Sequence, residues 1–213
     1  MHIPKKFRQE SQTELHEAIR RYPFASLITY SQSGLEVNHI PFVLKEVDGK
    51  QLLQGHIARA NPLWQNVDDQ SEALVVFNGP NHYISPNYYP TKKATGKAVP
   101  TWNYISVNVK GTLSYVHDSA WLYNMIDELT QEHELGRPEP WSVKDAPENY
   151  IQKMLPAIVG LEIKISSLEG QWKLSQNQPT ENKQGVIEGL LKENNSDANT
   201  MAALVKQHSN TSI

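Results

Sequence analysis

The chain alternates short runs of apolar, β-forming residues with clusters of turn-forming residues over most of its length. Six such runs predict strands: residues 24–30, 35–44, 52–58, 73–77, 104–116 and 158–168. Within the last two, apolar and polar residues alternate with a period of two, which is typical of a strand with one buried face. After a break at Asn78-Gly79-Pro80, a short strand is expected to resume at 82–85.

Helical periodicity occurs beside and after these strands. Residues 11–22 are expected to form a helix with a narrow apolar stripe of Leu15, Ala18 and Ile19, which stops at Pro23. Asp118 is expected to cap a helix that runs to about Glu134. Shorter helices are expected at 62–67, 146–154, 184–193 and 197–208.

The order of the elements indicates the fold class. Strands that follow one another through short turns predict an antiparallel meander rather than a βαβ arrangement. Many short antiparallel strands must protect their edges, which favours a barrel over an open sheet. We therefore predict a mainly β fold with peripheral helices, in which residues 1–180 form an antiparallel barrel of six to seven strands and residues 181–213 form a helical tail.

Composition narrows the functional classes. The 213 residues are 38% hydrophobic and 20% charged, which is typical of a globular chain, and the net charge of −3 does not indicate a nucleic-acid-binding surface. The chain has no cysteine, which excludes disulfides, thiolate metal ligands and cysteine nucleophiles. We expect no membrane span and no signal peptide, and therefore a soluble, cytoplasmic protein.

The segment from Gly55 to Pro62 has the composition of an anion site. It leads from a strand end into a predicted helix start, where backbone N–H groups and the positive end of the helix dipole favour a phosphate. Arg59 adds a permanently charged bidentate donor, and His56 and Asn61 add further donors. The alternative is that Asn61 only caps the helix and Arg59 is an ordinary surface residue.

Two further segments join aromatic and polar side chains at strand ends. Trp102 and Asn103 stand at the start of one strand, where they suit a planar ring that needs a wall and edge hydrogen bonds. The segment 170–177 ends the last strand with Trp172, Lys173, Ser175 and Gln176. The alternatives are core packing for the tryptophans and a solvated strand end for the polar residues.

Other chemistry is not indicated. The eight histidines are scattered, and Glu132-His133-Glu134 lacks the second histidine of a helical zinc motif, so we predict no metal. There is no nucleophile elbow, P-loop or dinucleotide fingerprint, and no catalytic residue is identified.

Taken together and in this order, these segments resemble one family, the PaiB-type FMN-binding negative transcriptional regulators. The resemblance spans about residues 1–190 and rests on Pro23-Phe24-Ala25, Asn38-His39-Ile40-Pro41, Gly55-His56-Ile57-Ala58-Arg59-Ala60-Asn61-Pro62, Phe77-Asn78-Gly79-Pro80, Tyr83-Ile84-Ser85-Pro86, Val99-Pro100-Thr101-Trp102-Asn103-Tyr104, Trp141, Ile158-Val159-Gly160 and Lys173-Leu174-Ser175-Gln176-Asn177. The chain departs from the family pattern at Asn87-Tyr88, where a tryptophan often precedes the tyrosine, and at Gln171, where lysine is frequent.

The resemblance implies an FMN-binding split barrel. It also implies a homodimer with FMN at the subunit interface, and a phosphate held around Arg59 and Asn61. Asn38 or His39, together with Trp172 and Lys173, is implied to lie near the flavin. The cofactor-binding set is completed by His56, Ile57, Ala58, Pro62, Trp102, Asn103, Ser175 and Gln176.

Two functions remain open. The chain is either an FMN-binding protein that acts through flavin binding or an FMN-dependent oxidoreductase reaction on an unknown small molecule, or a DNA-binding repressor without enzymatic activity. Direct DNA binding is weakly supported, because the tail from Asn182 onward has three lysines, three acids and no arginine.

Overall fold

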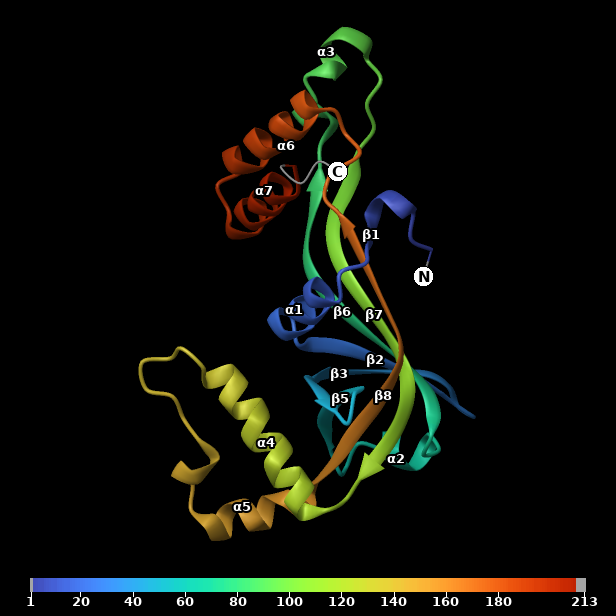
Figure 1. The fold of residues 1–213 in the computed structure, drawn as a ribbon, viewed down its shortest axis with the longest axis vertical. Coiled ribbons are helices and arrows are strands. Elements are labelled where there is room, and N and C mark those ends of the chain that lie inside the picture. Colours follow the sequence, from blue (N-terminus) through green and yellow to red (C-terminus); the bar gives the residue numbers. More distant parts are fainter. Residues whose placement is uncertain (1, 210–213) are drawn as a thin grey trace. The chain divides into compact units, whose positions relative to one another are not determined.

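The fold is built on one sheet whose strands pair mainly antiparallel (Figure 1). The computed structural model describes residues 2–209. The strands pair in the order β3-β2-β6-β7-β8-β5-β4, and β1 pairs with β8 outside this order. Their bounds are β1 Arg8–Gln9, β2 Phe24–Ser31, β3 Gly34–Pro41, β4 Val43–Val47, β5 Lys50–Ala58, β6 Ser71–Ile84, β7 Thr101–Val116 and β8 Ile158–Lys173.

The mainly β, antiparallel architecture is confirmed, although the described residues form eight strands where six to seven were predicted. One additional strand is the two-residue β1, whose Arg8 pairs with Gln171 of β8. The other arises because the predicted strand 35–44 is two strands. The chain changes partners at Phe42: β3 pairs with β2, β4 pairs with β5, and the buried Phe42 donates its N–H to the carbonyl of Pro23 at 3.0 Å.

The break predicted at Asn78-Gly79-Pro80 was wrong, because β6 continues through these residues. The pairing of β2 with β6 runs only from Leu74 to Val76, so Pro80 lies beyond it. A proline without an N–H is tolerated where a strand has no partner on that side. The last strand is also longer than predicted, and β8 therefore includes Trp172 and Lys173.

Six of the seven α-helices agree with the predicted positions within a few residues, and α3 was not predicted. Local caps explain two of them: Ser11 Oγ accepts from Glu14 N–H at 3.4 Å before α1, and Asp118 accepts from Trp121 N–H at 2.7 Å before α4. The α-helices are α1 Gln12–Arg21, α2 Leu63–Asn66, α3 Thr91–Thr95, α4 Ser119–Glu134, α5 Glu148–Met154, α6 Thr180–Lys192 and α7 Ser196–Ser209. Short 3₁₀ helices are η1 Lys5–Phe7, η2 Pro86–Tyr88, η3 Val143–Asp145 and η4 Leu155–Ala157.

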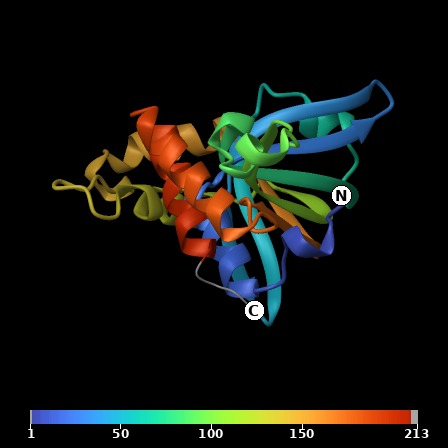
Figure 2. The same cartoon turned by 90° about the horizontal axis from the view of Figure 1, so that it is seen from above.

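The described residues divide into two compact units, and each is treated by itself below. The first unit lies within Met1–Leu15, Asn78–Val107 and Glu169–Ile213, and the second within His16–Phe77 and Asn108–Leu168. In the first unit, α6 and α7 pack against each other (Figures 1 and 2) through the buried Val186, Leu190, Met201 and Val205. The boundary predicted between a domain at 1–180 and a tail at 181–213 stays a prediction.

The core of the second unit includes a hydrophobic cluster on the buried side of α4. Leu122 and Met125 of α4 pack with Leu155 of η4, and the partly buried Ile126 and Ile151 lie against them. This packing joins α4 to the segment from α5 to β8, and it forms part of the wall of a cavity described below.

Candidate functional site

The segment after β5 is a tight turn held by Asn61. The Asn61 Oδ1 accepts from the backbone N–H of Leu63 at 3.0 Å, and its Nδ2 donates to Asn38 Oδ1 at 2.7 Å. The fold thus brings together two predicted site residues from β3 and from the turn after β5. The helix predicted at 62–67 is only the four residues of α2, with Pro62 just before it. So short a helix has little dipole, and an anion here depends on side chains.

Arg59 is held firmly by neutral partners. Its Nε donates to the carbonyl of Pro156 at 2.6 Å, and its Nη2 donates to the carbonyl of Ile158 at 2.9 Å. Its Cζ lies 5.7 Å from the ring centroid of Trp64, whose Nε1 donates to the Arg59 carbonyl. A guanidinium has five N–H donors, so donors remain on Nη1 and Nη2. The guanidinium is therefore oriented while it keeps capacity for an anion.

The two predicted histidines occupy different surroundings within the second unit. His39 is exposed on β3, where its Nδ1 lies 3.2 Å from Ser26 Oγ and its ring lies 6.1 Å from the ring of Phe24. His56 on β5 instead lines an apolar cavity, and burial lowers its pKa. Ile57 is buried beside it in β5, and Ala58 ends the strand as an exposed residue.

The β2–β3 hairpin, drawn in blue in Figure 2, has an apolar face. Strand register places Ile28 opposite Val37 and Tyr30 opposite Leu35, so these four side chains share one face of the hairpin. Leu35 is 74% exposed and Tyr30 is 70% exposed. A contiguous group of exposed apolar side chains on a hairpin is typical of a surface that another molecule covers. We call these four residues the hairpin face.

In the first unit, the start of β7 and the end of β8 bring the other predicted residues together. Asn103 of β7 is fully buried, its Nδ2 donates to Ser175 Oγ at 2.9 Å, and that hydroxyl lies 3.3 Å from Asn103 Oδ1. Ser175 has a φ of 61°, which is unusual for a residue other than glycine. The buried pair therefore ties the chain after β8 to the start of β7.

Lys173 and Trp102 flank this pair. The Lys173 ammonium donates to Thr101 Oγ1, and burial together with the nearby Lys6 lowers the pKa of Lys173. Trp102 is 53% exposed, and its ring meets the ring of Tyr83 edge to face at 6.0 Å. The first unit thus presents an exposed indole and a half-buried cation on adjoining strand ends.

Trp172 and Gln176 make contacts within the protein that stabilise the end of β8 and the turn after it. Trp172 is buried, and it packs so closely on Gly170 that a Cβ there would lie 2.5 Å from the indole. Gln176 closes the turn after β8: its Nε2 donates to the Trp172 carbonyl at 2.5 Å, and its Oε1 accepts from Leu174 N–H at 2.7 Å.

The sequence prediction did not include several residues that contact the predicted set. Trp64 and His117 lie beside Arg59, with Arg59 Nη1 3.5 Å from His117 Nδ1, while Thr101 and Tyr83 contact Lys173 and Trp102. The aromatic Trp64 lies close to Arg59 in sequence and could have been suspected. His117 could not, because it lies 58 residues from Arg59.

Within residues 2–209, no three metal-binding side chains of His, Cys, Asp or Glu type gather at one place. No helix in the same range has the length and apolar character to cross a membrane.

Comparison with known proteins identifies relatives of this chain. A family model described as "Putative FMN-binding domain" matches residues 1–167. An uncharacterized protein of Aspergillus fumigatus is 36% identical over an alignment of 224 positions, which covers 84% of this chain and 86% of that protein. Protease synthase and sporulation protein PAI 2 of Bacillus subtilis is 30% identical over 209 residues, which cover 97% of each chain.

Structural comparison supports the same fold. The FAD and heme binding protein from Mycobacterium smegmatis superimposes with a TM-score of 0.55 at 15% identity, covering 78% of this chain and 73% of that one. At this identity the likeness concerns the fold alone, and it agrees with the antiparallel split barrel predicted from the sequence. The match over residues 1–167 and the likeness to PAI 2 along both chains show that this chain belongs to the PaiB-type family of FMN-binding domains, whose cofactor is FMN.

Proposed function

We propose that the chain binds the FMN phosphate through Arg59, a cation of the second unit that the fold leaves without an acidic partner, and that Lys173 is a cation of the same kind within the first unit. Among residues 2–209, neither has a carboxylate within ion-pair distance: the partners of Arg59 are two carbonyl groups and the His117 ring, and the partner of Lys173 is a hydroxyl. A partly buried cation without an anion is unusual, because burial removes solvation that a neutral partner does not fully replace. A bound anionic cofactor supplies the missing charge.

In this proposal Arg59 receives the FMN phosphate. A phosphate accepts bidentate hydrogen bonds from a guanidinium, and a guanidinium that is already oriented loses less entropy when it binds. The carbonyl groups of Pro156 and Ile158 provide that orientation, and the Asn38–Asn61 hydrogen bond fixes the adjoining turn. His39, Ile57, Ala58 and Pro62 complete the proposed set in the second unit, whereas the predicted His56 instead lines the apolar cavity described below.

Within the first unit, taken by itself, we propose that the predicted residues suit a flavin ring. The exposed indole of Trp102 offers an aromatic wall, and the Lys173 ammonium offers positive charge to an electron-rich ring edge. Asn103, Ser175 and Gln176 hold these strand ends in place, and Trp172 supports them from the core. When bound, FMN supplies electron-transfer chemistry, while the chain supplies binding, orientation and charge.

We further propose that a second copy of the chain covers the hairpin face, so that the protein is a homodimer with FMN at the interface. The support is that Tyr30, Leu35 and Val37 are more than half exposed on one face of a two-stranded hairpin. Covering such a group removes apolar area from water, at about 25 cal/mol per Å².

For activity, we propose a flavin-dependent redox reaction on a small molecule, with any regulation of genes following from that reaction. The tail gives little support to direct DNA recognition, because the buried faces of α6 and α7 are used in packing against each other. Their exposed side chains include lysines and acids but no arginine, which is the commonest residue in specific base contacts.

A flavin titration tests the cofactor proposal. FMN is added to purified protein while its fluorescence is recorded, and saturable quenching at one FMN per chain is expected. Lys173→Met should weaken binding roughly tenfold, since one hydrogen bond to a charged group contributes about 1.5 kcal/mol. The exposed Lys192→Met is the matched control. Absence of saturable quenching in the unaltered protein would refute the proposal.

Molar mass in solution tests the dimer. Leu35→Lys places a charge on the hairpin face and should give the mass of one chain together with weaker FMN binding. Val47→Lys, at a 44% exposed apolar position on β4 outside that face, should leave the mass of two chains unchanged. A dimer that survives Leu35→Lys with unaltered FMN affinity contradicts the proposed interface.

A further inference from the structure

An apolar cavity of about 210 Å³ lies in the second unit beside α4 and α5. Its walls come from α4, from α5 and the 3₁₀ helices on either side, from the end of β5, from the start of β8 and from Trp141 in the segment after α4. The lining consists mainly of Tyr123, Ile126, Val143, Ile151, Leu155 and Ile158. Trp141 and Met154 also contribute, and each is nearly half exposed. The cavity is thus apolar in its depth and approachable at its rim.

Among the side chains that line this wall, His56 is the one with a buried polar atom that lacks a partner. Its Nδ1 is buried and has no hydrogen-bond partner. Burial also lowers the pKa of His56, so the ring is neutral near pH 7. The Nδ1 of a neutral imidazole donates or accepts according to the tautomer. A buried polar atom without a partner in the protein requires an explanation, and a bound ligand that provides the partner is one such explanation.

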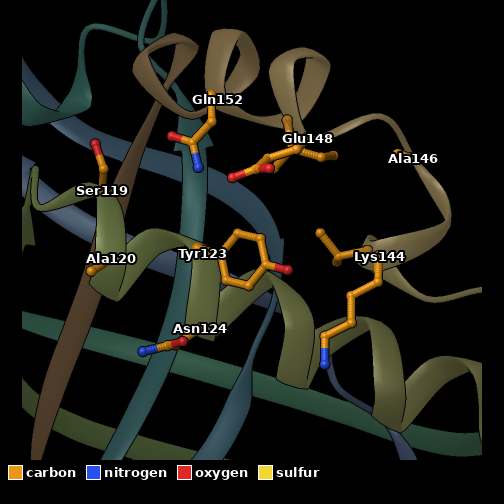
Figure 3. Close-up of a pocket in the computed structure, with 10 residues that line it drawn as sticks. Ser119, Ala120, Tyr123, Asn124, Lys144, Ala146, Glu148 and Gln152 are labelled. Atoms are coloured by element: carbon orange, nitrogen blue, oxygen red, sulfur yellow. The ribbon is translucent and has the colours of Figure 1, made fainter.

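A polar groove adjoins the cavity. The groove has a volume of about 640 Å³ and shares Tyr123, Val143 and Ile151 with the cavity wall. Figure 3 shows Tyr123 of α4 facing Glu148 and Gln152 of α5 across the groove, with Lys144 at one side. The shared walls give a small molecule a route from solvent past polar side chains to the apolar interior.

We propose that this cavity binds a small molecule with one ring and a single hydroxyl group, and that the His56 ring turns on binding so that its buried Nδ1 pairs with the hydroxyl. A cavity of about 150 Å³ holds benzene, so about 210 Å³ suits one six-membered ring with small substituents. A hydroxyl matches either tautomer of His56, because it both donates and accepts. The three fused rings of a flavin exceed this volume, so the site goes beyond the proposed FMN site.

Two fluorinated probes test the proposal. Fluorine NMR follows the binding of 4-fluorophenol and of fluorobenzene, which lacks the hydroxyl, to protein as purified and to protein saturated with FMN. We expect both probes to bind in both samples, with 4-fluorophenol preferred about fivefold because it pairs the buried nitrogen. Equal affinities, no binding of either probe, or loss of both on addition of FMN would overturn the proposal.

Variants locate the binding. Met154→Trp fills the rim of the cavity and should abolish binding of both probes, whereas Lys153→Trp, its neighbour on α5 outside the cavity wall, should not. His56→Phe keeps a ring but removes the nitrogen, and should reduce the affinity for 4-fluorophenol to that for fluorobenzene. Persistence of the preference in His56→Phe, or probe binding unaffected by Met154→Trp, contradicts the assignment. FMN affinity is measured on the same samples, so a failure of flavin binding is seen separately.

Discussion

Asn103 and Ser175 form a buried hydrogen-bonded pair. Replacing one of them should lower the free energy of unfolding by more, per residue replaced, than replacing both. Asn103 has no exposed surface and Ser175 has 3%, so neither polar group can turn to water. Asn103→Leu keeps the side-chain volume but leaves Ser175 Oγ without the amide that lies at 2.9 Å. Ser175→Ala keeps the backbone conformation at φ 61° nearly unchanged but leaves the Asn103 amide without the hydroxyl.

The magnitude follows from the desolvation of one unpaired group. A buried donor or acceptor without a partner costs about 1–3 kcal/mol, so each single variant should lose about 2 kcal/mol in the free energy of unfolding. In a chain of this length, 1 kcal/mol corresponds to about 2–4 °C in Tm, which gives a decrease of about 4–8 °C. In the double variant no unpaired group remains, so the combined loss should fall about 3 kcal/mol short of the sum of about 4 kcal/mol.

Urea unfolding followed by tryptophan fluorescence measures the four free energies of this cycle. The wild-type chain, both single variants and the double variant are compared in flavin-free buffer, so that ligand binding does not enter the result. Strict additivity of the two single losses would show that the two side chains do not depend on each other, and would refute the reasoning.

Three other changes have defined outcomes. Gly185→Ala on α6 would place a Cβ 2.1 Å from the Tyr88 carbonyl oxygen, and it should destabilise the chain by about 1–2 kcal/mol in urea unfolding despite its better helix propensity, whereas the exposed Glu188→Ala should change little. Burial and Glu193 raise the pKa of Tyr88 to about 12 from 10 in the unfolded chain, so the folded state favours the protonated phenol and its stabilising effect, complete below pH 10, is lost as pH rises to about 12. Tyr88→Phe should flatten the fall in Tm over that window, and an unaltered slope would contradict the assignment. Because burial lowers the pKa of His56, its contribution is present above pH 6.5 and lost as pH falls, so Tm at pH 5 should drop less in His56→Phe than in the wild-type chain.

Local patterns explain why much of the fold could be predicted. The caps at Ser11 and Asp118 and the alternation in β7 depend on residues close in sequence, and these elements appear where expected. The division of the predicted strand at Phe42 and the continuity of β6 through Pro80 depend on which strands lie alongside. That information is long-range, so the local pattern gave the wrong boundaries there.

In the candidate site too, some features depend on local sequence and others on distant parts of the chain. The turn at Asn61 is held by its own side chain, which accepts from the N–H of Leu63, and this local sequence was sufficient to mark it. The orientation of Arg59 depends on carbonyl groups about one hundred residues away, at Pro156 and Ile158, and no spacing within the motif indicates them. The place of His56 in an apolar cavity depends equally on α4 and α5, which follow it far along the chain.

The phosphate assignment is tested most directly by comparing FMN with riboflavin, which is the same flavin without the phosphate. Affinities are measured by flavin fluorescence for the wild-type chain and for Arg59→Ala. Wild type should prefer FMN, and Arg59→Ala should lose about 10- to 100-fold in FMN affinity, since hydrogen bonds to charged groups contribute about 1.5–3 kcal/mol, while riboflavin affinity stays unchanged. Undiminished FMN affinity in Arg59→Ala, or an equal loss for both flavins, would contradict the account.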